Sequence, residues 1–324
     1  MDKLVAAARS EGVLNVIALP RNWANYGALL DGFSAKYGIR IVSENPNGNS
    51  QDELDAVQNS GARSTAPDVL DLRMELAAAN ATLFAPYKVA TWGDIPDGQK
   101  DSNGQWFEDY GGYMSIGYDS AKVPAINTID DFLARAFAYK VSIEGDPNLV
   151  DSSLGAVVMA SIIEGGTMAD VSRGVNYFHL LKVSNHLYPL QASTATIKAG
   201  TTPVVFDWDY SVLAHGKDVP TWRVLVPDAA VVGGFYAQAI NKQAPHPAAA
   251  RLWEEYLYSD AGQNLLLQGM VRPVRMPAMQ TAGTIDQFAA ATLPTVNGAP
   301  VYLSPDQVAS ARTYLSSHWA TAVS

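Results

Sequence analysis

Two aspartates close an apolar run in the middle of the chain, and they are the residues best placed to do chemistry. The run covers residues 203–210 and reads PVVFDWDY, so Asp207 and Asp209 alternate with aromatic rings. Its β-branched residues predict a buried strand, and strands of α/β proteins present ligands at their carboxyl ends. Because side chains alternate along a strand, Asp207 and Asp209 should share one side, with Trp208 on the other. Carboxylates and an indole face favour a cationic ligand, the indole through a cation–π attraction of about 0.5–2 kcal/mol. A solvated acidic loop is the alternative interpretation.

The elements before this run predict a parallel α/β lobe. Short apolar strands over residues 13–18, 39–42 and 67–72 alternate with two helical patterns, of which the first runs from Trp23 to Tyr37. This β-α-β-α-β order is typical of a doubly wound sheet, whose ligands bind outside the carboxyl ends of the strands. The loops at these strand ends therefore supply further candidate ligand-binding residues: Arg21, Asn22, Trp23, Asn49 and Asp71.

Some of these residues have a plain structural alternative. Trp23 also fits the apolar stripe of its helix, so core packing is as reasonable as stacking on a ligand. Arg21, Arg272 and Arg275 could bind a carboxylate or phosphate through the guanidinium group, although a surface salt bridge is the simpler explanation for each of them. After the loop at Asn49, Ser50 and Glu53 have the spacing of a capping box that opens the second helix.

Two glycine-flanked strands are suited to crossing between lobes. They lie near residues 111–118 and 231–238, and they are the hinge candidates. The sequence then divides into a first lobe of residues 1–115 and 235–277 and a second lobe of residues 116–234 and 278–324. A second series of strands and helices, beginning with an expected strand over 139–143, supports a second α/β lobe.

Composition limits the function classes. The 324 residues are 48% hydrophobic and 17% charged, which indicates a globular chain of two domains or lobes. A net charge of −10 argues against nucleic acid or an anionic membrane surface as the partner. With no cysteine, thiol nucleophiles and thiolate metal sites are excluded. The first residues do not read as a secretory signal, so the sequence fits a cytoplasmic protein or an exported one whose signal peptide is absent here.

Three motifs carry a resemblance to a known family. The first is an A-x-x-E-G-x-L-x-V pattern at residues 8–16, and the second is K-x-A-x-H-P-x-A-A at residues 242–250. The third is S-x-x-G-Q at residues 259–263, followed by Gly269 and R-P-V-R at residues 272–275. In order and spacing the chain resembles the extracellular solute-binding proteins of ATP-binding cassette (ABC) importers, in the branch that includes polyamine, iron(III) and amino-compound binders.

The resemblance implies an α/β fold of the periplasmic-binding-protein type II, with two doubly wound lobes joined by two crossing strands and a ligand held between them. It implies no catalysis. We also expect no cofactor and no metal, and a monomer that meets the membrane permease of an importer in the periplasm or another extracytoplasmic space. By this likeness Trp208 and Asp209 bind the ligand, together with Phe235 and Tyr236 of the second crossing. Iron-binding members usually carry an adjacent tyrosine pair, and no Tyr-Tyr occurs in this chain.

We therefore expect a binder of a small amine-bearing solute, either a polyamine or a zwitterionic amino compound. The alternatives are a binder of an anion such as a phosphonate or carboxylate, a binder of iron(III), and an enzyme acting in a cleft between lobes. The five histidines show no metal-ligand spacing, and neither a phosphate-binding loop nor a nucleophile motif occurs.

Overall fold

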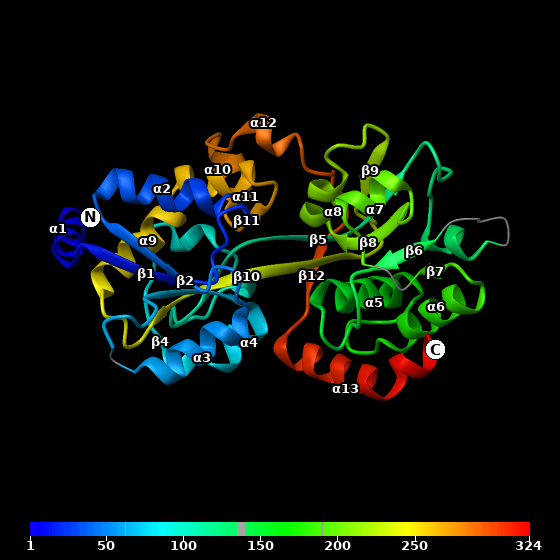
Figure 1. Ribbon diagram of the computed structural model, residues 1–324, viewed down its shortest axis with the longest axis horizontal. Coiled ribbons are helices and arrows are strands. Elements are labelled where there is room, and N and C mark those ends of the chain that lie inside the picture. Colours follow the sequence, from blue (N-terminus) through cyan, green and yellow to red (C-terminus); the bar gives the residue numbers. More distant parts are fainter. Residues whose placement is uncertain (62, 135–139, 189–190) are drawn as a thin grey trace. The chain divides into compact units, whose positions relative to one another are not determined.

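The chain folds into two compact units, each assembled from segments that are distant in the sequence (Figure 1). The computed structural model describes residues 1–61, 63–134, 140–188 and 191–324. Unit 1 comprises Met1–Gly111 and Phe235–Thr292, and unit 2 comprises Gly112–Gly234 and Leu293–Ser324. The sequence analysis divided the chain after residues 115, 234 and 277, whereas these units divide it after residues 111, 234 and 292.

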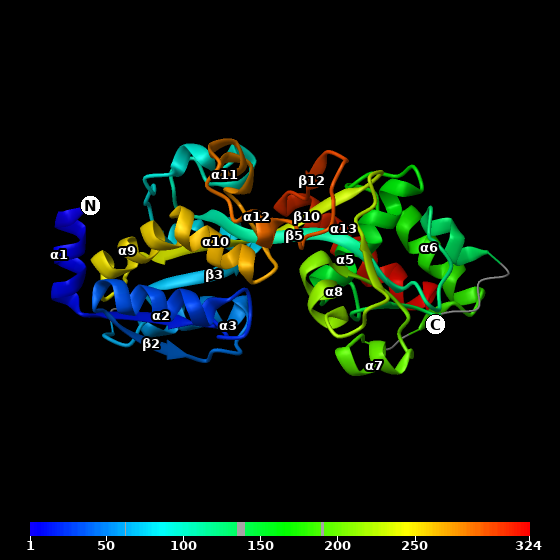
Figure 2. The same ribbon diagram turned by 90° about the horizontal axis from the view of Figure 1, so that it is seen from above.

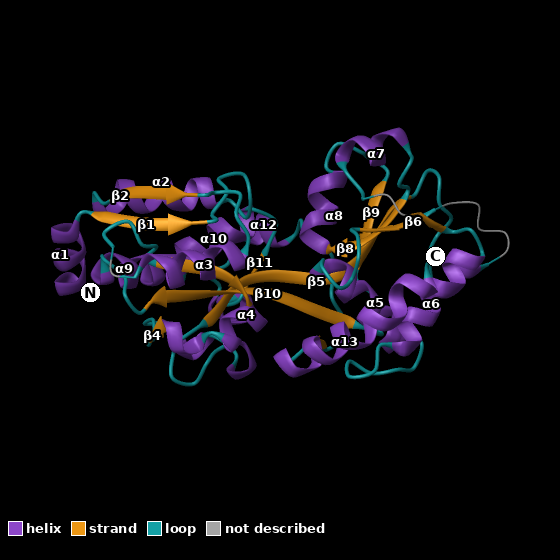
Figure 3. Cartoon of the chain, turned by 60° about the horizontal axis from the view of Figure 1, so that its bottom comes forward, coloured by secondary structure: helices purple, strands orange, loops and turns teal. Residues whose placement is uncertain are grey.

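Unit 1 is built on a mixed sheet in which three parallel strands meet an antiparallel one. The strand order is β2 (Arg40–Glu44), β1 (Val13–Ile17), β3 (Val69–Arg73) and β10 (Val231–Asn241). β1 pairs in parallel with β2 and β3, and Figure 3 shows β1 and β2 side by side. β3 pairs antiparallel with β10, so that Arg73 at the carboxyl end of β3 lies opposite Tyr236.

Helices cover both faces of this sheet, and the alternation along β3 decides which side chains face which helix. Leu70 and Leu72 pack with Ala237 and Ala239 of β10 against helices α3 (Ser50–Ser60) and α4 (Met74–Ala79). Asp71 lies between these leucines and therefore faces the opposite side, where α2 (Tyr26–Tyr37) packs. Figure 1 shows α2 and the pair α3 and α4 on opposite faces of the unit 1 strands.

The remaining elements of unit 1 extend this core. They are α1 (Asp2–Glu11), β4 (Phe84–Ala85), the amino-terminal part of β5 (Phe107–Asp119), α9 (Pro247–Leu257), α10 (Asp260–Gln268), β11 (Arg272–Pro273), α11 (Met276–Ala282), α12 (Gln287–Ala290) and three short 3-10 helices at Ala81–Leu83, Trp92–Asp94 and Asp97–Gln99.

Unit 2 contains a second mixed sheet. β8 (Val204–Trp208) lies between β5, which is antiparallel to it, and β6 (Val141–Ile143), which is parallel. β7 (Leu187–Tyr188) pairs with β6, and β9 (Trp222–Leu225) pairs with β5. The strand expected over 139–143 is thus present as β6, although residue 139 lies outside the described residues.

Two helix layers enclose the unit 2 sheet. Val204 and Phe206 of β8 belong to a core with α5 (Asp151–Ile163), α6 (Ser172–Val183) and α13 (Pro305–Ala322). Val205, which points the other way, packs with α7 (Thr194–Ala199) and α8 (Asp209–Gly216). Figure 2 shows α7 and α8 on the side of this sheet away from α6. A 3-10 helix at Ile129–Leu133 and β12 (Pro300–Tyr302), which pairs with Val231–Gly233, complete the unit.

The first two sequence motifs meet at the start of α9. Glu11, the last residue of α1, accepts hydrogen bonds from the backbone N–H groups of Ala248 (3.0 Å) and Ala249 (2.8 Å). A carboxylate at this position satisfies donors that a helix leaves free in its first turn and complements its dipole. His246, just before α9, donates its backbone N–H to Asp68 at 2.7 Å. The motif residues therefore fix the first helix to a segment that follows it by more than 230 residues.

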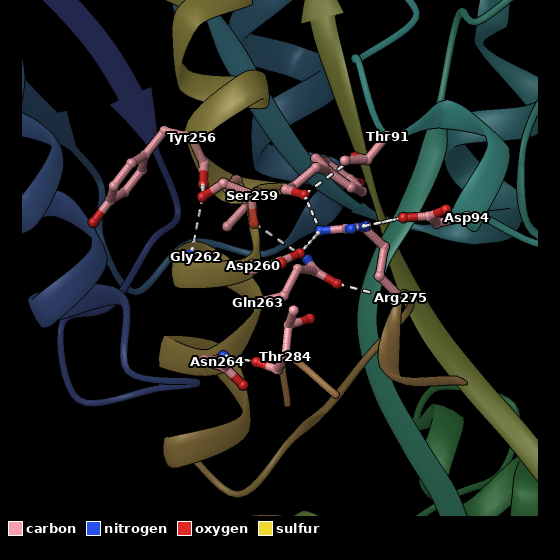
Figure 4. Close-up of polar contacts among 12 residues, drawn as sticks. Thr91, Asp94, Tyr256, Ser259, Asp260, Gly262, Gln263, Asn264, Arg275 and Thr284 are labelled. Carbon is pink, nitrogen blue, oxygen red and sulfur yellow. Dashed lines mark hydrogen bonds and ion pairs between the residues drawn. The ribbon is translucent and has the colours of Figure 1, made fainter. Parts of the chain in front are cut away.

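The third motif forms a polar network around Arg275 (Figure 4). The Arg275 guanidinium bonds Asp94 at 2.6 Å, Asp260 at 2.9 Å and the backbone carbonyl of Tyr258 at 2.6 Å. Its backbone N–H donates to the Gln263 side chain at 3.1 Å. The side chain of Arg275 is 6% exposed, so this arginine forms buried ion pairs within unit 1.

None of the helices within the described ranges combines the length and the apolar character needed to cross a membrane.

Candidate functional site

The mid-chain acidic run ends a strand, and its first carboxyl is buried there. β8 stops at Trp208, and Asp207 is 4% exposed. Its Oδ1 accepts the Trp208 backbone N–H at 2.7 Å, and the hydroxyls of Ser152 and Ser211 also donate to the carboxyl. Burial, and next the charge of Glu144, raise the pKa of Asp207 to about 7. The neutral form of Asp207 is therefore substantially populated at neutral pH.

Glu144 is a second buried carboxyl at the neighbouring strand end. Ile143 of β6 pairs with Phe206 of β8, so Glu144 and Asp207 are the next residues along two adjacent parallel strands. Glu144 receives hydrogen bonds from the Gln191 side chain and the Ala192 backbone, while its Oε1 is buried without a hydrogen-bond partner in the part of the chain that the structure describes. Burial raises the pKa of Glu144.

Glu144 is not among the residues that the sequence predicts to bind a ligand, because the Gly-Asp-Pro segment after it is typical of a turn. The available signal was its place directly after a strand that is a parallel neighbour of β8. We call Glu144, Ser152, Asp207, Trp208 and Ser211 the unit 2 acidic site.

Trp208 follows Asp207 on β8 and packs against the core that contains α5, on the other side of the strand. Its indole lies against Gly155 of α5 and Gly234 of β10. A Cβ atom on Gly155 would lie 3.1 Å from the indole Cη2, and one on Gly234 would lie 2.5 Å from it. Only residues without a side chain leave room for the ring in this position, and the indole stays partly exposed.

Asp209 has a different environment from Asp207. It is the first residue of α8, so the alternation of the strand ends before it. Its Oδ1 accepts the backbone N–H groups of Tyr113 (3.1 Å) and Tyr210 (3.0 Å), and a Cβ on Gly112 would lie 2.2 Å from that oxygen. The expectation that Asp207 and Asp209 present their carboxyls on one strand side is therefore wrong. Asp209 fastens α8 to β5, whereas Asp207 faces Glu144 and two serines.

Unit 1 contains its own group of acids and rings, which we call the unit 1 tyrosine–acid cluster: Tyr26, Asp71, Asp109, Tyr110 and Gln238. Asp71 Oδ2 accepts the hydroxyls of Tyr26 (2.8 Å) and Tyr110 (3.1 Å), and its Oδ1 is buried without a partner among the described residues. Asp109 Oδ2 accepts the Gln238 amide at 2.9 Å. Burial raises the pKa of Asp71 to about 7, and burial together with the charge of Asp71 raises the pKa of Asp109 well above its ordinary value.

Two of the expected aromatic residues border this cluster. The Tyr236 ring stacks on Tyr110 with centroids 5.5 Å apart, and Trp23 Nε1 donates to the Tyr110 hydroxyl at 2.9 Å. Trp23 precedes α2 and is not part of its apolar stripe, because Ala24 and Asn25 have positive φ angles of 45° and 61° that delay the helix until Tyr26. Phe235, next to Tyr236 on β10, is partly buried.

The other expected site residues lie outside the two groups. Arg21 forms an exposed ion pair with Asp31 at 2.5 Å, and Asn22 beside it is exposed. Arg272 is 7% exposed, and its backbone pairs with Gly111 of β5.

Asn49 begins α3, where its Oδ1 accepts the N–H groups of Gln51 (2.9 Å) and Asp52 (3.2 Å). The capping box is thus formed by Asn49 and Asp52, and the assignment to Ser50 and Glu53 is wrong by one residue. Ser50 and Glu53 are instead buried against β3. Ser50 Oγ accepts the Arg73 N–H at 3.0 Å, and Glu53 Oε2 accepts the Asp71 N–H at 2.8 Å.

The carboxyl groups of the unit 2 acidic site suit a cation that carries N–H donors. Both carboxyls are acceptors when ionised, and the groups that shift their pKa values include no lysine, arginine or histidine of the described chain. Within the same described ranges, no group of three or more His, Asp or Glu residues is arranged to hold a metal ion.

Comparison with known proteins gives a consistent assignment. The model of the family described as bacterial extracellular solute-binding protein matches residues 69–288. A search of curated protein sequences finds no match.

Solved structures are similar over nearly the whole chain. An extracellular solute-binding protein from Bordetella parapertussis is 14% identical with a TM-score of 0.77, over 97% of this chain and 100% of that one. A GABA receptor is 17% identical with a TM-score of 0.72, over 96% and 97%. The spermidine/putrescine substrate-binding protein of an ABC transporter from Streptococcus pneumoniae is 13% identical with a TM-score of 0.71, over 96% and 99%. At these identities the likenesses concern the fold, and the expected α/β fold of periplasmic-binding-protein type II is confirmed.

Proposed function

Because the chain belongs to the family of bacterial extracellular solute-binding proteins, we propose that it captures a small amine-bearing solute and delivers it to the membrane permease of an ABC importer. The solute is a polyamine or a zwitterionic amino compound. The protein works in the periplasm or another extracytoplasmic space, as a monomer that binds its ligand without chemical turnover. The expectation that the ligand is held between two lobes stays a prediction.

One observation carries the proposal: two carboxyls, Glu144 and Asp207, are buried at adjacent strand ends. A buried carboxylate needs compensation, and an oxygen such as Glu144 Oε1 without a partner is costly until a donor reaches it. An ammonium group supplies both the opposite charge and the N–H donors. Trp208, which the sequence analysis expects to bind the ligand, stays part of the proposal, in which its indole face would add cation–π attraction.

The neighbours support this class of solute. Two of the similar structures are those of a GABA receptor and of a spermidine/putrescine substrate-binding protein, and the solutes named for both are amines. From the sequence we also expect Asp71, Phe235 and Tyr236 to bind the ligand. We keep this as part of the proposal because Asp71 Oδ1 also lacks a donor among the described residues.

The two alternative ligand classes have weaker support. Two of the guanidinium groups that could bind an anion are already paired: Arg21 with Asp31, and Arg275 with Asp94 and Asp260. Iron(III) prefers phenolate oxygens, and burial raises the pKa values of Tyr26 and Tyr110 well above 10, which opposes phenolate formation.

The test is a thermal-shift screen with diamines, amino acids, phosphonates and iron(III) citrate, followed by calorimetry on the best compound. A ligand that binds the folded protein raises the melting temperature by mass action. We expect an amine to give the largest shift in melting temperature. Asp207→Asn should weaken the affinity for this amine about 10- to 100-fold, which corresponds to the usual contribution of a hydrogen bond to a charged group. The matched control is Asp306→Asn, an exposed aspartate of unit 2. A shift with phosphonate or iron alone would contradict the proposal.

A further inference from the structure

We propose that the unit 2 acidic site accepts an ammonium group that still carries N–H donors, a primary or secondary ammonium, and rejects quaternary ammonium groups. The inference rests on the proposed function, since it assumes an amine-bearing ligand, and it specifies which amines can bind. It follows from counting hydrogen-bond donors and acceptors at the site.

The acceptors of the site are fixed, and one of them has no donor. Ser152 and Ser211 donate to Asp207, and Gln191 and Ala192 hold Glu144. These contacts leave Glu144 Oε1 without a partner among the described residues. Because the carboxyl is already held by its neighbours, it does not need to reorganise when a donor arrives.

Ser142 adds to this polar surface. It lies on β6 two residues before Glu144. Its Oγ is fully buried and has no partner within the described residues. A hydroxyl can accept an N–H as readily as it donates, so Ser142 is a further acceptor next to Glu144.

A quaternary ammonium would not satisfy these groups. It brings charge but only methyl groups at its surface, so Glu144 Oε1 would remain buried without a donor. A primary ammonium carries three N–H donors and can reach more than one acceptor at once.

Sites for quaternary ammonium use several aromatic rings around the cation. Here the rings beside Trp208 in sequence are engaged elsewhere. Phe206 packs against Phe132 and Phe178 in the core, and Tyr210 is buried against Gly112. Trp208 is therefore not joined by these neighbours in an aromatic cage. The site recognises its ligand mainly through carboxyl oxygens.

The experiment compares matched pairs of compounds by calorimetry with the full chain. One pair is 4-aminobutyrate and 4-(trimethylammonio)butyrate, and the other is 1,4-diaminobutane and its bis(trimethylammonio) analogue. In the pair that binds, we expect the N–H form to bind about 10- to 100-fold more tightly. Glu144→Gln should weaken the N–H form and reduce this ratio, while Asp306→Asn should leave the ratio unchanged.

The outcomes separate the inference from the proposed function. Equal affinity for both members of a pair overturns the donor requirement and leaves amine binding intact. Preference for the quaternary member does the same. Binding of neither member of either pair, with a response to a phosphonate or iron(III), overturns both. The comparison in the parent protein decides the question even if Glu144→Gln folds poorly.

Discussion

Glu144 and Asp207 follow directly on Ile143 and Phe206, which are paired in adjacent parallel strands, and burial, followed by the charge of Glu144, raises the pKa of Asp207. Two like charges at neighbouring strand ends are unfavourable together unless a cation or a proton accompanies them. The raised pKa of Asp207 favours a proton in this role, and in our proposal an ammonium group replaces it.

The first prediction concerns the pH dependence of binding. Because the pKa of Asp207 is raised to about 7 and that of Glu144 is raised as well, an ammonium ligand must displace a proton below neutral pH. Affinity for the best amine should therefore rise as the pH increases from about 5.5 to 8. The check is calorimetry in two buffers of different ionisation enthalpy, which reveals proton release directly. Affinity that is constant over this range would contradict the exchange of proton for ammonium.

The second prediction concerns the pKa of Asp207 itself. Glu144→Gln removes the neighbouring negative charge while it keeps the volume and an acceptor, so the pKa of Asp207 should fall. Burial alone still holds it above the ordinary value of an aspartate. The measurement is a carboxyl-carbon NMR titration of both proteins. An unchanged or higher pKa in Glu144→Gln would show that the two groups do not interact.

The third prediction concerns the stability of unit 1 as a function of pH. Burial raises the pKa values of Asp71, Asp109 and Glu254, so these groups are protonated in the folded state at a pH at which the unfolded chain has lost the proton. Their contribution to stability is complete below the ordinary carboxyl pKa and is lost as the pH rises through the folded values, about 7 for Asp71. The melting temperature of unit 1 should thus fall between pH 5 and pH 8.

Glu254→Gln tests this linkage most cleanly, since both of its carboxyl oxygens are buried without partners among the described residues. The variant should melt higher than the parent at pH 8 and similarly to it at pH 5. Glu44→Gln, an exposed glutamate of unit 1, is the control that should follow the parent at both values. A variant that melts lower than the parent at pH 8 would show that Glu254 is ionised and compensated.

The fourth prediction concerns the space beside Trp208. Gly234→Ala places a methyl group where the indole lies, 2.5 Å from Cη2, so the ring must move. Overpacking of this kind costs about 1–3 kcal/mol of stability and should also weaken amine binding. Thermal melting and calorimetry measure the two effects. Gly93→Ala is the matched control, because a Cβ at that position meets nothing within 4 Å. Equal behaviour of the two variants would remove Trp208 from the site.

The fifth prediction concerns the cap on α9. Glu11→Ala removes the carboxylate that accepts the N–H groups of Ala248 and Ala249, and it should lower the free energy of unfolding by about 1–2 kcal/mol. Glu11→Gln retains an acceptor and should lose less. In urea denaturation, the free energy of unfolding should decrease in the order parent protein, Glu11→Gln, Glu11→Ala. The reverse order for Gln and Ala would mean that the hydrogen bonds contribute nothing.

The fold was largely accessible from the sequence because apolar periodicity determines it directly. The β-α-β-α-β order of the first 75 residues and the presence of a strand in the run at 203–210 are confirmed, although this strand ends at Trp208. The family motifs were informative for a physical reason: Glu11, Gln263 and Arg275 hold the scaffold together, so they belong to the fold and not to a particular ligand.

The candidate site was less accessible because it depends on which strands become neighbours. Glu144 joins Asp207 only through the pairing of β6 with β8, which no local pattern reports. Asp209 follows Asp207 by two residues, yet the change from strand to helix at Trp208 turns it toward β5. Ser50 and Glu53 had the spacing of a cap, but their burial against β3 assigned the cap to Asn49 and Asp52.

The discontinuity of unit 1 has a consequence for biosynthesis. Its strand β3 pairs with β10, and α1 is fastened to α9, so the amino-terminal third of the polypeptide lacks its partners until residues 235–292 have been synthesised. A nascent chain that ends earlier exposes β3 as an unprotected edge, which favours association with other chains or with a chaperone. Unit 1 can therefore complete its folding only after translation has passed Gly112–Gly234, the first segment of unit 2, and has also produced residues 235–292.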